Sequence, residues 1–164
     1  MTTETIVVRL LLIMLLAGII GIEREYHGKP AGLRTNVIVG LAATLMTISS
    51  VRTLDIFPDV KSLDPTRITS TIITGIGFIG AGAILRKSRG NGDGVIGLTT
   101  AATLWLVTGL GIAVGMGFYF EAMFTTALVF FTFVALTRIV DWTRMYAKAH
   151  PPTPISEEDY HDDN

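Results

Sequence analysis

The residues best able to do chemistry gather in one short segment near the N-terminus. Its charged side chains lie within twelve residues of one another: Glu23, Arg24, Glu25, Lys29 and Arg34. Arginines at a membrane boundary can bind lipid phosphate or dock on the surface of a partner protein. In this interpretation Glu23 pairs with an arginine. The alternative is structural: the charges snorkel to the interface and form ion pairs that fix a turn. We call this segment the functional loop.

A second candidate for chemistry is the polar segment before the third apolar run, where Asp64 and Arg67 stand. Magnesium keeps several of its waters and prefers carboxylate or carbonyl oxygen. Asp64 and Arg67 are therefore candidates for an outer ion contact. No helical histidine–carboxylate spacing indicates a bound metal, and no nucleophile–base pair is present. We expect no enzymatic activity, no catalytic residue and no cofactor, with magnesium the one ion considered.

Glycine supplies a third pattern, concentrated in one apolar segment. The glycines of this segment are Gly75, Gly77, Gly80 and Gly82. Small residues let membrane helices approach closely, as the spacings Ala17-xxx-Gly21 and Gly111-xxx-Gly115 also suggest. We interpret them as packing positions inside one bundle or across a homodimer. The alternative is a hinge or gate at residues 75–82.

The composition places all these residues in a membrane protein. Of 164 residues, 49% are hydrophobic and 16% charged, against about 25% charged in a soluble domain. Uncharged runs of this length are typical of transmembrane helices. A soluble enzyme is thereby excluded. A nucleic-acid binder is excluded too, because the net charge is -1 and no basic face is present.

The apolar runs predict an all-α bundle of five transmembrane helices. We expect them at about residues 6–22, 36–51, 68–85, 97–114 and 118–137. One helix over 97–137 would be about 61 Å long, whereas the hydrocarbon core is about 30 Å thick. The stretch must therefore turn back, and the glycines at Gly115 and Gly117 place that turn.

The distribution of Lys and Arg predicts the orientation. The segments after the first, third and fifth helices share one side and hold nine basic residues, against four on the other side. Basic residues are retained in the cytoplasm, so we expect the N-terminus outside and the C-terminus inside. Residues 1–138 would form the transmembrane domain. Residues 139–164 would be a short cytoplasmic tail with a disordered end.

Three ordered motifs resemble those of the MgtC/SapB family of bacterial inner-membrane proteins. The first is Glu23-Arg24-Glu25 with residues 28–35, and the second is the glycine-rich segment 75–84. The third covers residues 95–102 with Trp105, and includes Gly97 and Thr100. The resemblance extends over about residues 11–137. We assign Gly97, Thr100 and Trp105, with the glycines of the second motif, to helix packing or gating.

The resemblance implies a multi-pass inner-membrane protein linked to magnesium limitation and homeostasis, and to survival inside macrophages. It implies a regulator of other membrane complexes, such as the membrane sector of the ATP synthase or an uptake system. The alternative is a small magnesium transporter or channel. Virulence members carry a folded cytosolic domain after the last helix, whereas about 26 residues follow Arg138 here, as in a short form. We expect the lipid bilayer and a second copy, as a homodimer, as further partners.

Overall fold

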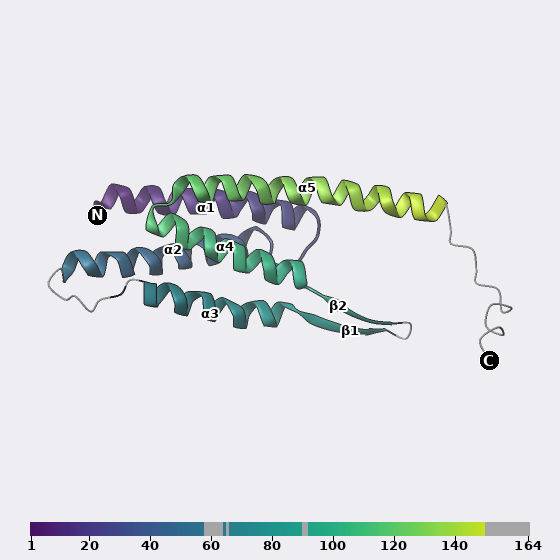
Figure 1. The fold of residues 1–164 in the computed structure, drawn as a ribbon, viewed down its shortest axis with the longest axis horizontal. Coiled ribbons are helices and arrows are strands. Elements are labelled where there is room, and N and C mark those ends of the chain that lie inside the picture. The colour runs from purple at the N-terminus through teal and green to yellow at the C-terminus, as the bar shows by residue number, and fades with distance from the viewer. Residues whose placement is uncertain (58–63, 65, 90–91, 150–164) are drawn as a thin grey trace, which may run out of the picture. The chain divides into compact units, whose positions relative to one another are not determined.

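The computed structural model describes residues 1–57, 64, 66–89 and 92–149 of the chain (Figure 1). In chain order its elements are α1 (Thr3–Tyr26), α2 (Leu33–Ile56), α3 (Thr66–Ala83), β1 (Leu85–Arg89), β2 (Gly92–Ile96), α4 (Leu98–Met116) and α5 (Tyr119–Ala149). The described residues thus form five helices, which confirms the predicted helical class. The end of the predicted tail, residues 150–164, lies outside the described residues.

A β-hairpin between α3 and α4 is the element that the sequence analysis missed. Leu85, assigned above to the third helix, instead begins β1 and pairs with Ile96 of β2 in an antiparallel register. The apolar segment gives way here to Arg86 and Lys87. Outside the helix, the backbone amides and carbonyls still need partners, and the strand pairing supplies them.

Four of the described helical segments are long and apolar enough to cross a membrane. They lie in α1, in α2, in α4 and over Tyr119–Val140 of α5. The chain is therefore a multi-pass membrane protein. The eighteen residues of α3 include Arg67 and several Thr and Ser side chains, and this helix is not among the four. A fifth crossing and the orientation of the termini stay predictions.

The chain divides into two compact units, Met1–Phe130 and Phe131–Asn164. In the second unit, α5 continues to Ala149, and Trp142 stacks on Tyr146 with ring centroids 5.9 Å apart. The turn between α4 and α5 lies in the first unit, where the glycines predicted it. There Gly117 caps α4 with φ +99, a left-handed conformation that favours glycine.

The core of the first unit forms where α2 packs against both α1 and α4. Ile13, Ile20, Val107 and Val114 are fully buried in it. Small residues set the separation of these helices. A Cβ on Gly21 would lie 2.7 Å from Leu33 Cα, and one on Gly115 would lie 2.6 Å from Thr47 Cβ. The close packing expected of the Gly21 and Gly115 faces is confirmed.

Hydroxyl groups in this core find partners without water. Thr44 Oγ1 donates to the Gly111 carbonyl across the α2–α4 contact at 2.9 Å. Other threonines, such as Thr47 and Thr108, donate to the carbonyl four residues earlier in their own helix. The hydroxyls of these three threonines are therefore satisfied by backbone carbonyls of the packed helices.

Arg9 is the one charged residue inside the first apolar run, and it connects α1 to the α4–α5 turn by hydrogen bonds. Its Nη1 donates to the Gly115 carbonyl at 2.6 Å, and its Nε donates to the Tyr119 hydroxyl at 2.9 Å. The guanidinium thereby gains charge-assisted hydrogen bonds at the end of the spans.

The α2–α4 contact yields a first prediction. In Gly111→Ala, the new Cβ would lie 2.7 Å from the Gly40 carbonyl oxygen and 2.8 Å from Ala43 Cβ. The two helices must separate, so we expect the free energy of unfolding in mild detergent to fall by about 1–3 kcal/mol. Gly109→Ala is the matched control, because nothing lies within 4 Å of its Cβ position. Equal stability of the two variants would contradict the close contact.

Candidate functional site

The functional loop divides into a buried pair and an exposed set. Glu23 and Arg24 lie in the last turn of α1. They are only 7% and 5% exposed, respectively. Glu25, Lys29 and Arg34 are exposed. Simple snorkelling would leave all five charged groups in water, so Glu23 and Arg24 depart from that interpretation.

Glu25 has a structural partner. Its Oε2 accepts a hydrogen bond from the Leu33 amide at 2.8 Å and so caps the start of α2, where Gly32 makes no side-chain cap. A Cβ on Gly32 would lie 2.8 Å from the same Oε2. The glycine is therefore needed for the carboxylate to reach the helix end.

Asn36, which the sequence analysis did not select, completes this turn. Its side chain is fully buried, and its Nδ2 donates to the carbonyls of Ala31 and Gly32. Ala31 adopts φ +56, a conformation that a non-glycine residue rarely takes. The only signal in the sequence was an amide in the first turn of an apolar run.

Glu23 faces His27 one turn later in the chain. His27 Nδ1 lies 3.0 Å from Glu23 Oε1 and 2.9 Å from the Glu23 carbonyl oxygen. The second carboxylate oxygen, Oε2, is buried and has no hydrogen-bond partner among the described residues. A buried carboxylate oxygen of this kind can bind a cation, since a buried charge requires a partner.

A cavity of about 560 Å³ brings the first and third motifs together. Its lining consists of Arg24 and residues 28–30, of residues 95–100, and of Ala83 and Leu85 at the α3–β1 junction. Two residues assigned to helix packing, Gly97 and Thr100, are thus beside the functional loop. We call this space the loop cavity.

Gly97 is a glycine for two physical reasons. Its φ of +92 lies in the left-handed region, and a Cβ would collide with the Ala83 carbonyl. This close approach joins the end of α3 to the start of α4 beside the loop cavity. Trp105, from the same motif, is 57% exposed and is not among the residues that line the cavity.

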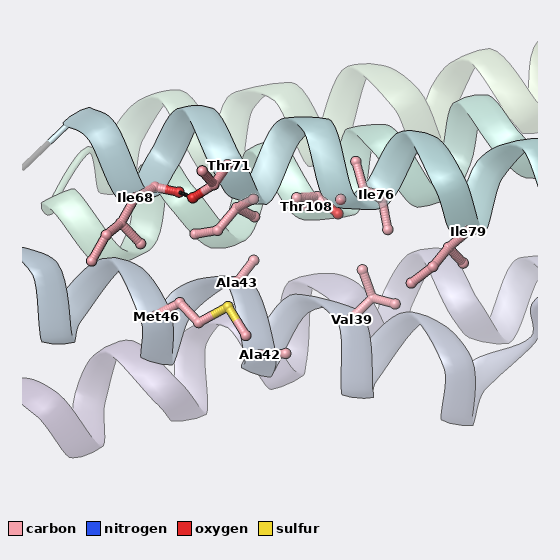
Figure 2. Close-up of a pocket in the computed structure, with 11 residues that line it drawn as sticks. Val39, Ala42, Ala43, Met46, Ile68, Thr71, Ile76, Ile79 and Thr108 are labelled. Atoms are coloured by element: carbon pink, nitrogen blue, oxygen red, sulfur yellow. Dashed lines mark hydrogen bonds between the residues drawn. The ribbon is translucent and has the colours of Figure 1, made fainter.

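A second cavity, of about 370 Å³, lies between α2, α3 and α4 (Figure 2). Val39, Ala42 and Met46 of α2 face Ile68, Ile76 and Ile79 of α3 across it. The Thr71 hydroxyl on this wall donates to the Ile68 carbonyl at 2.7 Å. The lining is mostly apolar, so this groove suits a hydrocarbon chain or an apolar side chain better than a hydrated ion.

The glycines of α3 have different surroundings. Gly80 is buried, with a Cβ position 3.7 Å from Ala101 Cβ of α4. At Gly75, Gly77 and Gly82 a Cβ would meet nothing within 4 Å among the described residues. In the described part of the chain, Gly80 is thus the one of these four glycines that has a neighbour in ordinary van der Waals contact. Packing of the other three across an interface stays a prediction, as does a gate.

Asp64 lies just before α3, and its side chain forms hydrogen bonds with the first residue of that helix. Its Oδ1 accepts hydrogen bonds from the Thr66 hydroxyl at 2.6 Å and the Thr66 amide at 2.8 Å. These bonds hold the pKa of Asp64 below its usual range. Asp64 and Arg67 are both exposed. The described residues hold no cluster of three potential metal ligands, and an ion contact at Asp64 stays a prediction.

Comparison with known proteins adds a family and several bacterial relatives. The model of the MgtC family matches residues 10–142. The chain is 44% identical to "Protein SapB" of Bacillus subtilis over 71% of this chain and 50% of that protein. It is 41% identical to "Putative magnesium transporter YhiD" of Escherichia coli K12, over 71% of this chain and 54% of the relative.

A further relative is "Protein MgtC" of Salmonella typhimurium strain 14028s, 42% identical over 75% of this chain and 48% of that protein. The chain thus spans about half the length of the curated relatives it matches. No solved structure matches it. The apolar helices and these bacterial relatives together place the chain in the inner membrane as a multi-pass protein.

The geometry of Glu25 yields a second prediction. Glu25→Ala removes the cap of α2, and we expect the free energy of unfolding to fall by about 1 kcal/mol. Glu25→Gln keeps an acceptor oxygen and should lose less. Arg34→Ala, also exposed and in the same loop, serves as the control. Denaturation in mild detergent measures all three, and an unchanged Glu25→Ala variant would rule out the capping role.

Proposed function

The chain belongs to the MgtC family, and we propose on that premise that it regulates other inner-membrane complexes when magnesium is scarce. It does so without catalysis, by docking its helices on those of a partner. The expected partners are the membrane sector of the ATP synthase, another transporter, or a second copy of the chain. The link to magnesium is carried over from the resemblance and from the printed name of one relative.

The exposed glycines of α3 are the observation that favours docking. Gly77 and Gly82 leave space where a Cβ would stand, and Phe78 between them is 85% exposed, whereas Gly75 lines the groove toward α2. In lipid, helices associate through close van der Waals contact at small residues. A foreign helix can therefore approach α3 more closely than it could approach a face of large side chains.

Gly77→Leu tests this proposal. The new side chain fills open space, so the fold and membrane insertion should persist while a close-packed partner is displaced. The readout is a mild-detergent pull-down from native membranes, with partners identified and their stoichiometry counted. We expect at least a tenfold loss of the partner, which corresponds to about 1.4 kcal/mol.

The matched control is Gly109→Leu, since Gly109 of α4 also has nothing within 4 Å of its Cβ position. It should retain the partner. Gly80 is a poorer choice because its substitution would disturb Ala101 within the chain. A partner retained at full stoichiometry by Gly77→Leu, or no stoichiometric partner at all, would refute docking through α3.

The alternative function is transport of magnesium, and Glu23 is the observation that favours it. Its buried Oε2 has no hydrogen-bond partner among the described residues, and it lies at the end of a membrane span. Carboxylate oxygen is a preferred ligand of magnesium. One relative is named a putative magnesium transporter.

Flux measurements in liposomes separate the alternative from the regulator. A transporter that uses Glu23 should lose magnesium flux several-fold in Glu23→Gln, because the charge that attracts the cation is gone. Glu4→Gln, an exposed carboxylate at the other end of α1, is the control. Equal flux in liposomes with and without the protein would remove transport from consideration.

A further inference from the structure

We propose that the groove between α2, α3 and α4 holds one acyl chain of phosphatidylethanolamine, a zwitterionic phospholipid, whose headgroup lies against Arg67 and Asp64. This inference goes beyond the proposed function, because it concerns a bound lipid and not a docked protein helix. It stands on four features of the described residues: the chemistry of the lining, the length of the groove, the small residues that form it and the charges at its end.

The side chains that line this groove offer no free hydrogen-bond donor to a ligand. Among the described lining residues, two have polar side chains, Thr71 and Thr108. The Thr71 hydroxyl donates to the Ile68 carbonyl at 2.7 Å, and the Thr108 hydroxyl donates to the Leu104 carbonyl at 2.9 Å. A polar ligand would lose its water here without gaining these hydrogen bonds. The lining therefore favours a hydrocarbon.

The length of the groove suits one acyl chain. The lining follows α3 from Ile68 to Ile79 (Figure 2), a distance of about 17 Å at about 1.5 Å per residue. One leaflet of the hydrocarbon core is about 15 Å thick, half of about 30 Å. Met46, Ile68 and Ile79 in the lining are exposed, and α2 is apolar enough to cross a membrane. The groove is therefore open to lipid, and one apolar side chain of a partner would fill only part of its length.

Small residues create the space in which the chain would lie. Ala42 and Ala43 stand on the α2 side, between Val39 and Met46 (Figure 2). On the α3 side, Gly75 lines the groove, and nothing lies within 4 Å of its Cβ position. The volume of about 370 Å³ is within the range of small-molecule sites. Because packed helices leave few large voids, a groove of this size is suited to a ligand.

The charges at one end of the groove match a zwitterionic headgroup. Arg67 directly precedes Ile68, the first lining residue of α3, and Asp64 lies just before the helix. Hydrogen bonds from Thr66 lower the pKa of Asp64, and the charge of Arg67 adds to that shift, so an ionised carboxylate lies near the guanidinium. Arg67 can bind a phosphate while Asp64 attracts an ammonium. Both side chains are exposed and can extend to the headgroups.

Lipid titrations of the purified, delipidated full chain test the proposal, in an uncharged detergent at constant ionic strength. The probes are palmitoyl-oleoyl-phosphatidylethanolamine and the phosphatidylglycerol with the same acyl chains. Native mass spectrometry counts the bound lipids. We expect one phosphatidylethanolamine per chain, bound at least threefold more tightly than phosphatidylglycerol, because the second lipid has no ammonium for Asp64.

The first variant tests the groove. Gly75→Leu places a large side chain in the open space, so phosphatidylethanolamine should bind about fivefold more weakly or worse. Gly109→Leu is the matched control, because Gly109 also has nothing within 4 Å of its Cβ position and is not a lining residue. It should bind within twofold of the parent chain. The thermal midpoint without lipid checks that each variant is folded.

Two exposed residues test the headgroup contact independently of the groove. Arg67→Gln should weaken both lipids about fivefold, with Arg34→Gln as the control that stays within twofold. Asp64→Asn keeps an acceptor oxygen for Thr66 but removes the charge. It should therefore abolish the preference for phosphatidylethanolamine.

Each result either supports or overturns the lipid site. Preferential binding of phosphatidylethanolamine that Gly75→Leu and Arg67→Gln weaken, and their controls do not, supports it. Full binding by a folded Gly75→Leu chain overturns it, because the lipid then lies elsewhere. Equal affinity of the parent chain for the two lipids overturns it as well. Absence of saturable binding of either lipid also overturns it, and leaves the groove to side chains of a partner helix.

Discussion

The close approach of α2 to α1 and α4 is the constraint on which the rest of the structure depends. In lipid, apolar side chains gain little by leaving their surroundings, so helices associate through van der Waals contact and short polar bonds. Gly111 and Gly115 permit both, since a Cβ on either would collide with α2. The Thr44 hydroxyl can then reach the Gly111 carbonyl across the contact.

This packing determines what stands at each end of the core. At one end, Arg9 reaches Gly115 and Tyr119 because α1 passes close to the end of α4. At the other end, the start of α4 lies beside the α1–α2 loop and closes the loop cavity. The functional loop therefore combines two roles. Glu25 holds the start of α2, which leaves Arg24 and Lys29 in the cavity lining.

The third helix has a different relation to the core. It packs on α4 around Gly80 and leaves a groove toward α2. It also has the most open glycines and carries Arg67 and several hydroxyls. Gly77 and Gly82 of this helix are thus open to a further helix, while α1, α2 and α4 pack among themselves. The proposed docking residues Gly77 and Gly82 are not among the residues that line the loop cavity.

The sequence alone determined the membrane class, the five helices and the turn at Gly117, because apolar length and turn glycines are local properties. It could not separate Gly111, which contacts α2, from Gly77, which is open, because that difference depends on a neighbouring helix. Nor could it predict the β-hairpin or the buried Thr100. Burial, capping and cavities arise between segments distant in sequence, so only the tertiary structure decided them.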